Sequence, residues 1–407
     1  MKILIATDCY KFNTGGITAS VLALCNGLRR KGHEVKVLSP SNSQKSFRDG
    51  DDYFIKSVPA FYYPGQRIAF LVHNPLLKEL ELWRPDVIHV QTEGLVCFAA
   101  KSISRKCNAP IIMTCHTDYA HFVFGRLRYF TLIKAFMREI GKYLYRDAVK
   151  VIVPSQKAGN FAFLHSVKER MTVISNGIEL EKYQKALSSS EKLLLRQSLG
   201  IDVGTKVMVS VSRLSKEKNI SELIEFLPLL LKKMPDIKLL LVGDGPSKSQ
   251  LEKQVKKLNI SDNIVFAGSK PAEDVWRYYN ISDIFVSASA FEVHSMSCLE
   301  ALAQGLPLLC RADDALKGVL EHNQNGMIYH SEEEFSEFAF RMLSDERISK
   351  NMRQKSLEKA EEFSSDAFAS SVMRLYEDAI KEKCNFEKGN AVSDEEKRLC
   401  DQAYETP

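Results

Sequence analysis

The sequence predicts an α/β protein made of two doubly wound domains in tandem. Short unbroken apolar runs, such as KILIAT at residues 2–7 and DVIHVQ at residues 86–91, alternate with segments of helical length. Such runs are typical of parallel strands that are buried on both faces. The alternation restarts at residue 206, and 407 residues exceed the size at which a single core stops growing. We therefore expect two domains that face a central cleft, where ligands bind.

The first domain is expected over residues 1–180. KILIAT leads into the loop DCYKFNTGG and then a helix over residues 17–31, which Gly32 closes. Later strands of this domain are expected at residues 34–40, 86–91, 109–116 and 148–155. A helix near residues 364–383 is expected to join the same domain.

The second domain is expected over residues 206–363, after a polar, serine-bearing linker at residues 181–205. Its apolar runs are KVMVSVS, IKLLLV, NIVFAG, DIFVSAS and PLLC, with helices near residues 220–233 and 247–258 between them. Residues 386–407 carry many charges and lack strand periodicity, so we expect a mobile tail there.

The composition narrows the class of protein. A hydrophobic content of 45% and a charged content of 26% are ordinary for a globular chain, and a net charge of +5 is too mild to indicate nucleic acid. Nine cysteines without a C-x-x-C pair favour the reducing cytoplasm over a disulfide framework. The first residues lack the apolar region of a signal peptide, and no window approaches the roughly 18 apolar residues of a spanning helix. We expect a cytoplasmic protein that is not integral to the membrane.

Three loops that follow strands of the second domain carry the residue types of a phosphate site. KVMVSVS leads into RLSKEKN with Arg213 and Lys218, IKLLLV leads into GDGP with Gly243, and DIFVSAS leads into an acidic segment. Cations neutralise phosphate, and glycine lets backbone N–H groups approach it. Each signal alone is more often a solvated charge or a turn. Because loops leave parallel strands at the same edge of a sheet, the three together predict a phosphate-bearing ligand.

The acidic segment, FEVHSMSCLEALAQGLP, places Glu292 and Glu300 eight positions apart. Ser297 and Glu300 have the spacing of a capping box, in which the serine starts a helix and the glutamate bonds back to it. Glu300 is then structural, and Glu292 is a solvated loop acid. In the other interpretation both carboxylates bind a ligand, with Glu300 on the first turn of a helix whose N-terminus faces the phosphates. The neighbouring loops favour this second interpretation.

These motifs, taken in order, resemble those of the retaining glycosyltransferases with two Rossmann-like domains, the GT-B fold. The likeness covers nearly the whole chain and includes LRRKGHEVKVLSP, DVIHVQT, TCHTDY, VIVPSQ, VISNGIEL, SRLSKEKN and LVGDGP. Sucrose synthases, mannosyltransferases and glycolipid synthases belong to this family. The resemblance implies a hexosyltransferase that uses a nucleotide sugar.

The resemblance also implies roles for single residues. Arg213 and Lys218 should grip the donor pyrophosphate, Glu300 should hold the ribose, and Glu292 should face the donor sugar. His116 in TCHTDY should lie beside the reacting sugar, although a lone histidine is more often structural. Further donor contacts are expected from Gly15, Gly16, Gly243, Ser295 and Met296. The first two glycines would let their loop approach the ligand closely, or they simply form a turn.

One departure from the family concerns the donor sugar. The family commonly has glycine where this chain has Ser295, after Val293 and His294. A serine N–H can still bond to phosphate, but the bulkier loop can reshape the sugar pocket. UDP-glucose is the donor that the resemblance implies, and the residues alone leave both sugar and base open. No metal is expected, because the D-x-D spacing of Asp49 and Asp51 lies in a polar loop.

The acceptor is expected to be a membrane lipid. The stretches YYPGQRIAF and DDALKGVLEHNQNG look most like the bacterial enzymes that glucosylate diacylglycerol. The aromatic-rich segment at residues 122–147 adds a second argument, because its cations are Arg126, Arg128, Lys134, Arg138, Lys142 and Arg146. A helix with a basic stripe and an apolar remainder can lie on anionic lipid, although an amphipathic core helix has the same pattern. We expect peripheral association with the inner face of the cell membrane.

The expected reaction retains the anomeric configuration of the donor. The acceptor hydroxyl attacks from the face that the nucleotide leaves, and its proton passes to the departing phosphate oxygen. Catalysis then depends on positioning and charge stabilisation, with domain closure excluding water. Three alternatives remain: a soluble or polyprenyl-linked glycan as acceptor, a nucleotide-sugar epimerase of the same architecture, and a non-catalytic nucleotide-sugar binding module.

Overall fold

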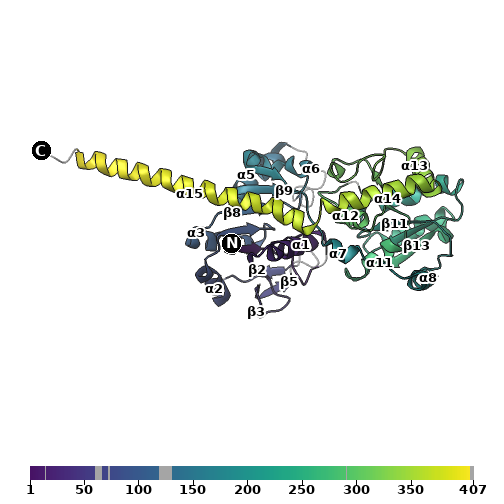
Figure 1. The fold of residues 1–407 in the computed structure, drawn as a ribbon, viewed down its shortest axis with the longest axis horizontal. Helices are drawn as coiled ribbons and strands as arrows, with labels where there is room; N and C mark the ends of the chain where they lie inside the picture. Colours follow the sequence, from purple (N-terminus) through teal and green to yellow (C-terminus); the bar gives the residue numbers. More distant parts are fainter. Residues whose placement is uncertain (14, 60–66, 72–73, 119–130, 290, 404–407) are drawn as a thin grey trace. The chain divides into compact units, whose positions relative to one another are not determined.

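The structure, a computed structural model, describes the chain except for residues 14, 60–66, 72–73, 119–130, 290 and 404–407. It contains two compact units, each with its own parallel sheet (Figure 1). Unit 1 comprises Met1–Pro154, Ala158–Ile174 and Phe368–Pro407, and unit 2 comprises Ser155–Lys157 and Ser175–Ala367. The linker expected at residues 181–205 lies within unit 2, where it forms two short helices, α7 (Leu180–Tyr183) and α8 (Ser189–Ser198).

Unit 1 has an eight-stranded sheet in the order β10-β9-β8-β7-β1-β2-β4-β3, parallel except for the β3–β4 hairpin. Its strands are β1 (Lys2–Ala6), β2 (Glu34–Pro40), β3 (Phe47–Asp49), β4 (Asp52–Ile55), β7 (Val87–Val90), β8 (Ile111–Thr114), β9 (Ala148–Val153) and β10 (Met171–Val173). A separate antiparallel pair is formed by β5 (Ser57–Pro59) and β6 (Arg67–Ala69).

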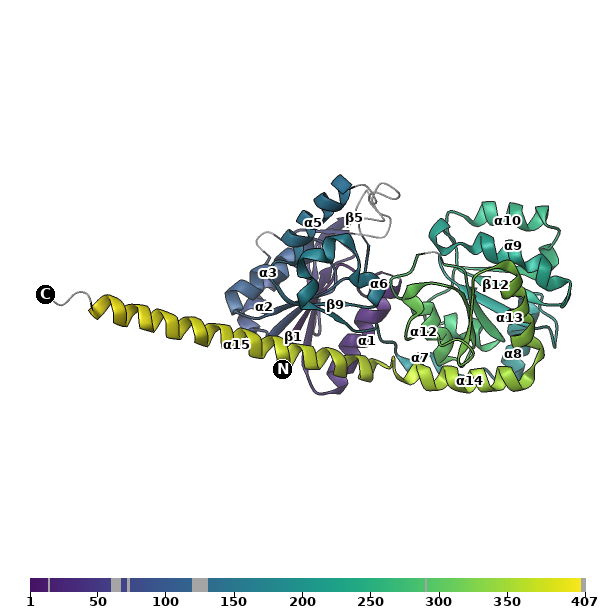
Figure 2. The ribbon, with the colours of Figure 1, turned by 90° about the horizontal axis from the view of Figure 1, so that it is seen from above.

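Helices cover both faces of this sheet. The helical elements are α1 (Gly16–Arg30), α2 (Pro75–Trp83), α3 (Leu95–Cys107), α5 (Thr131–Tyr145), α6 (Gln156–Gly159), η2 (Ala162–Arg170) and α15 (Ser365–Ala403). Residues of α1 and α15, such as Leu24, Val372 and Tyr376, share a core with Ile3 and Ile5 of β1. Figure 2 shows α1 and α15 on the same side of the sheet.

The end of the chain differs from the expectation. Residues 386–403, where a charged, mobile tail without strand periodicity was expected, continue helix α15. No proline interrupts residues 365–403, and the many Lys, Glu, Arg and Ala residues favour a helical backbone even without strand periodicity.

Unit 2 has a fully parallel six-stranded sheet in the order β13-β12-β11-β14-β15-β16. Its strands are β11 (Val207–Val211), β12 (Lys238–Val242), β13 (Ile264–Gly268), β14 (Ile284–Ser287), β15 (Leu308–Arg311) and β16 (Gly326–Tyr329). Its other helical elements are η3 (Lys216–Lys218), α9 (Ile220–Leu231), α10 (Lys248–Lys257), η4 (Ser261–Asn263), α11 (Val275–Asn280), α12 (Met296–Ala303), η5 (Asp314–Leu316), α13 (Glu332–Ser344) and α14 (Glu346–Glu361). Apolar residues of α9, α10 and α13 pack with the inward residues of these strands.

The strand order determines where the site of unit 2 lies. The strands β11, β12, β14 and β15 are neighbours and parallel, so the loops that follow them leave at one edge of the sheet. Those loops contain RLSKEKN, GDGP, the acidic segment and the doubled aspartate Asp313–Asp314. Within the described ranges, no helix is both long enough and apolar enough to cross a membrane.

Candidate active site

The loop after β11 presents the two expected phosphate-binding cations. The guanidinium-bearing Arg213 is exposed, and Lys218 ends the short helix η3 in a partly buried position. The hydroxyl of Ser289, which follows β14, donates to the carbonyl of Glu217 at 3.3 Å. The loops after β11 and β14 are therefore joined beside Lys218.

The GDGP loop after β12 packs directly against the RLS backbone. A Cβ on Gly243, whose φ is +142°, would lie 1.9 Å from the carbonyl oxygen of Ser212. The N–H of Leu214 donates to the carbonyl of Asp244 at 3.0 Å. Glycine is thus required at position 243 because the protein's own backbone comes so close. This packing holds the loop that carries Arg213, which is a structural role beside the donor contact expected for Gly243.

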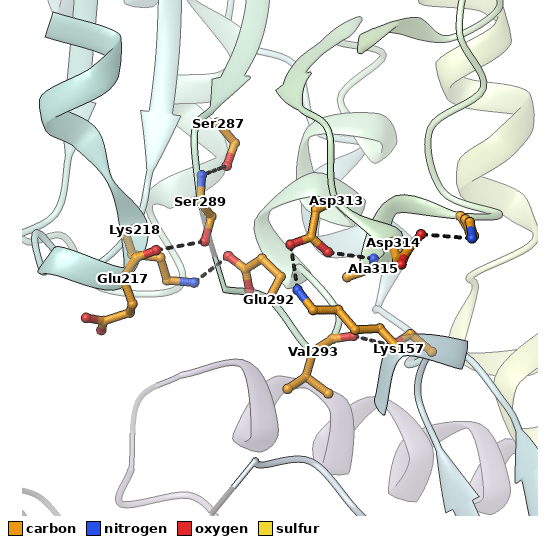
Figure 3. Close-up of polar contacts among 12 residues, drawn as sticks. Lys157, Glu217, Lys218, Ser287, Ser289, Glu292, Val293, Asp313, Asp314 and Ala315 are labelled. Atoms are coloured by element: carbon orange, nitrogen blue, oxygen red, sulfur yellow. Dashed lines mark hydrogen bonds and ion pairs between the residues drawn. The ribbon is translucent and has the colours of Figure 1, made fainter. Parts of the chain in front are cut away.

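Lys218 and Glu292 form an ion pair, with Lys218 Nζ 2.5 Å from Glu292 Oε1 (Figure 3). The side chain of Glu292 is 14% exposed and that of Lys218 is 26% exposed, so water screens the pair only in part. The structure therefore brings together two residues that the sequence places 74 positions apart. A diphosphate that binds Lys218 would compete for the same ammonium group and would release the Glu292 carboxylate.

Glu300 is not a helix cap. Helix α12 begins at Met296 with Ser295 as its N-cap, no side chain caps its first turn, and Glu300 is the fifth helical residue. The hydroxyls of Tyr183 and Tyr279 donate to its two carboxylate oxygens at 2.8 and 2.9 Å. The capping-box interpretation and the first-turn position are both wrong, because the helix starts one residue before Ser297 rather than after it.

Burial raises the pKa of Glu300 above its ordinary value, and the two tyrosine hydroxyls offset part of that rise. Each carboxylate oxygen has a second lone pair, so it can also accept a hydrogen bond from a ligand hydroxyl. Neither tyrosine was a candidate from sequence, because no local pattern joins residues 183 and 279 to the acidic segment.

A second ion pair lies near the first. Lys157 Nζ is 2.5 Å from Asp313 Oδ2 (Figure 3). The same ammonium group lies over the ring of Phe291, 5.3 Å from its centroid. Asp313 accepts from the N–H of Ala315 and so caps the short helix η5. Two acids and two lysines thus line the same edge of unit 2. Two features of the sequence could have indicated this pair: Lys157 comes shortly after the end of β9, and the doubled aspartate comes shortly after β15.

The residues at which the acidic segment differs from the family pattern are buried. His294 is 8% exposed, and neither of its ring nitrogens has a hydrogen-bond partner in the part of the chain that is described. Burial lowers the pKa of His294 to about 4, so the ring is neutral. Ser295 Oγ lies 3.2 Å from Ser297 Oγ, and Met296 is buried in the first turn of α12. These buried side chains therefore contribute to the packing of the loop.

Unit 1 contains the remaining candidates. Gly15 is the N-cap of α1 with φ +137°, and Gly16 is the first helical residue. Among the described residues other than its chain neighbours, no atom lies within 4 Å of a Cβ added to Gly15, so its backbone conformation rather than crowding favours glycine there. His116 follows β8, is buried, and places Nε2 2.8 Å from Oε1 of Gln91.

The basic segment is helical over α5. Arg126 and Arg128 lie outside the described residues, whereas Lys134, Arg138, Lys142 and Arg146 are all exposed. Three large apolar residues of α5 are exposed as well, Leu132 at 85%, Phe136 at 57% and Tyr143 at 54%. The buried side of the helix contains Met137, Gly141 and Tyr145. The exposed side of α5 therefore carries both cations and apolar side chains.

Comparisons with known proteins agree with this architecture. Residues 14–182 match the model of Glycosyltransferase Family 4, and residues 191–383 match that of glycosyl transferases group 1. The chain is 30% identical to the alpha-monoglucosyldiacylglycerol synthase of Streptococcus pneumoniae, over 97% of this chain and 89% of that protein. It is 28% identical to the synthase of that name from Acholeplasma laidlawii, over 93% and 98%. HepE of Anabaena in complex with UDP-glucose superposes with a TM-score of 0.70 at 19% identity, over 93% of this chain and 100% of that one.

Two Rossmann-like units with loops of this kind define a glycosyltransferase of the GT-B fold, and the predicted fold class is confirmed. The chain belongs to the glycosyl transferases group 1 family, whose bacterial glycolipid synthases are among its relatives.

Proposed function

We propose that this protein is a retaining hexosyltransferase that moves glucose from UDP-glucose to a membrane lipid acceptor such as 1,2-diacylglycerol. The observation that carries the donor half is the Lys218–Glu292 pair, beside the exposed Arg213 and the start of α12. Two cations and a helix N-terminus supply what a diphosphate needs, without a requirement for a metal.

The donor sugar and nucleotide have separate contacts in this proposal. Glu300, held by two tyrosine hydroxyls, accepts from the ribose hydroxyls, and Glu292 accepts from a hydroxyl of the sugar once the diphosphate has taken Lys218. Ser295 and Met296 offer the N–H groups of the first turn of α12 to phosphate. Glucose and diacylglycerol are proposed because the relatives with 30% and 28% identity are named for that product.

The reaction needs no protein nucleophile. An acceptor hydroxyl attacks the anomeric carbon on the face that the nucleotide vacates, the C–O bond to the β-phosphate breaks, and the hydroxyl proton passes to the departing phosphate oxygen. Arg213 and Lys218 stabilise the charge that develops on that oxygen. His116 and Glu292 position the sugar for the attack.

Helix α5 is proposed to bring the enzyme to the lipid. Leu132, Phe136 and Tyr143 recur at intervals of four and seven residues, so they lie along one exposed strip of the helix. Lys134, Arg138 and Lys142, which are exposed as well, recur every four residues on a different side of the same helix. A helix that exposes both apolar side chains and cations suits an interface with anionic lipid, which supports peripheral binding at the inner membrane face.

The test is transfer of a radiolabelled sugar, followed by partition between organic and aqueous phases. We expect label from UDP-glucose in the organic phase only when 1,2-diacylglycerol is present, with an α linkage in the isolated product. Lys218→Ala should abolish most of the transfer, whereas Lys216→Ala, an exposed lysine on the same short helix, should not.

The alternatives give other results in the same assay. Label that moves only to a soluble or polyprenyl-linked glycan identifies a different acceptor. Nucleotide release or sugar epimerisation without any acceptor identifies an epimerase. Donor binding without turnover, for every nucleotide sugar and acceptor supplied, identifies a binding module and overturns the proposal.

A further inference from the structure

A chain of buried polar side chains leads from the core of unit 1 to His116. The strands β7 and β8 pair in parallel with His89 opposite Ile112. Because side chains alternate between faces, His89 and Gln91 of one strand share a face with Ile112, Thr114 and His116 of the next. Four of these residues, His89, Gln91, Thr114 and His116, are buried polar groups.

His89 has partners at both ring nitrogens. Its Nδ1 is 2.6 Å from the hydroxyl of Tyr376 on α15, and its Nε2 is 2.7 Å from Oγ1 of Thr114. Burial lowers the pKa of His89 to about 3, so the imidazole is neutral and one nitrogen donates while the other accepts. The in-plane hydrogen-bonding positions of the ring are therefore filled.

The amide of Gln91 lies between the two histidines. Its Nε2 is almost equally far from both ring nitrogens of His89, at 3.1 and 3.2 Å, and a point so placed lies over the ring face. The face of a neutral aromatic ring is electron-rich and accepts an N–H more readily than a carbonyl oxygen. The amide nitrogen therefore faces His89, and the amide oxygen faces His116 Nε2 at 2.8 Å.

We propose that Gln91, oriented by His89, is a positioning residue that fixes His116 in the tautomer with its proton on Nε2. A carbonyl oxygen can only accept, so the Nε2 of His116 must donate to it. In the neutral ring Nδ1 then carries no proton, so any hydrogen bond at that atom has the imidazole as its acceptor. The inference rests on the proposed role of His116 and deepens it.

The first readout of the test is the tautomer of His116, from long-range proton–nitrogen NMR spectra of the full chain labelled at histidine. The His116→Gln spectrum assigns the signals. We expect a protonated Nε2 and an unprotonated Nδ1 in the parent protein. Gln91→Met, which keeps the length of the side chain but has no acceptor, should give a mixture of both tautomers. Gln91→Glu, which keeps an acceptor oxygen, should retain the proton on Nε2.

The second readout is kinetic. Gln91→Met should lower kcat roughly tenfold with little change in the KM for the donor, in line with the loss of an orienting partner. Gln91→Glu should recover part of kcat. Gln354→Met on the exposed face of α14 is the matched control and should change neither readout.

The outcomes separate this inference from the proposed function. A Gln91→Met protein that keeps the proton on Nε2 overturns the inference, whatever its activity. A mixed tautomer with an unchanged kcat supports the hydrogen bond inferred here and instead overturns the role given to His116. A melting temperature close to that of the parent shows that the variant is folded, and Gln91→Leu serves as a second acceptor-free variant if Gln91→Met is not.

Discussion

Lys218 Nζ lies 2.5 Å from Glu292 Oε1, so the expected phosphate cation and the expected sugar acid are ion-pair partners. A diphosphate can replace Glu292 as the partner of Lys218 because it offers more anionic oxygens. The two expected cations therefore differ in their surroundings: Lys218 is partly buried and paired with an acid, whereas Arg213 is exposed.

The first prediction follows from that difference. Arg213→Ala and Lys218→Ala should each weaken donor binding by about 1.5 to 3 kcal/mol, the contribution of one charge-assisted contact. Only Lys218→Ala should also lower the melting temperature, because it leaves the partly buried Glu292 without its cation. Calorimetric donor titration and thermal unfolding measure the two effects. Unchanged donor affinity in both variants would remove these residues from the phosphate site.

The second prediction concerns the two acids. Glu292→Gln should mainly lower kcat, because its carboxylate faces the sugar in the proposed mechanism. Glu300→Gln should mainly raise the donor Kd, because it removes an anionic acceptor for the ribose. Steady-state kinetics combined with UDP binding separates the two. The assignment fails if Glu300→Gln alters stability while donor affinity stays the same.

Glu300 also contributes a pH dependence. Its pKa in the folded protein is raised above the ordinary 4.5, so its contribution to stability is fully present below that value and is lost as pH rises through the folded pKa. Glu300→Gln should abolish this loss, and its stability relative to the parent should increase from about pH 4 to pH 7. Urea unfolding at several pH values measures the difference. A constant difference between the two proteins would contradict the raised pKa.

The third prediction concerns Gly243. Gly243→Ala should destabilise unit 2 by more than the 1 to 3 kcal/mol that a positive φ typically costs, because the new Cβ would also lie 1.9 Å from the carbonyl oxygen of Ser212. Donor binding should fall with it, since the displaced loop carries Arg213. Gly268→Ala is the matched control, with φ +73° and open space around the added Cβ. Equal losses in both variants would show that close packing contributes nothing.

The fourth prediction concerns His294, whose ring packs near Phe363 with both nitrogens unpaired among the described residues. Its pKa falls from 6.5 to about 4 on folding, so its neutral form supports the fold above pH 6.5 and stability is lost as pH falls toward 4. At 1.36 kcal/mol per pH unit, the loss is about 3 kcal/mol. His294→Phe should remove this acid sensitivity and should stabilise the protein at neutral pH by about 1 kcal/mol or more. Denaturation at pH 7 and pH 4.5 tests both statements, and a variant as acid-sensitive as the parent would contradict them.

The fifth prediction tests α5 as a lipid-binding face. Replacing Lys134, Arg138 and Lys142 together with glutamine should remove about 3 kcal/mol of attraction to anionic vesicles, or about a hundredfold in binding. Leu132→Ser with Phe136→Ser should weaken the binding that persists at high salt, because apolar contacts are not screened. Both sets should leave donor binding in solution unchanged.

Exposed lysines on α10 provide the matched control for the vesicle experiment. Lys253, Lys256 and Lys257 changed together to glutamine remove the same charge from unit 2 and should leave vesicle binding nearly unchanged. Equal losses from both triple variants would indicate a response to net charge alone. If the α5 variant binds vesicles as strongly as the parent protein, α5 does not contribute to lipid binding.

The sequence by itself determined the two α/β units and the loops that carry the candidate site residues. Strands buried on both faces appear as unbroken apolar runs, and the parallel order brings the loops after β11, β12 and β14 to one edge. Both signals are local, because each depends on residues within one element or at its end. The helical end of α15 is the exception, since its charged residues lack an apolar period and only their weak helix propensity indicates a helix there.

Only the tertiary structure decided which side chains meet. Ser297 and Glu300 satisfy the spacing of a capping box, but α12 begins at Met296 and two tyrosines from other elements hold the glutamate. Tyr376 and His89 are 287 positions apart and share a hydrogen bond of 2.6 Å. Such contacts depend on how distant elements pack, and hydrogen bonding over a few ångströms leaves no periodicity in the chain. The sequence therefore identified the loops of the candidate site, and tertiary packing determined which side chains within those loops contact one another.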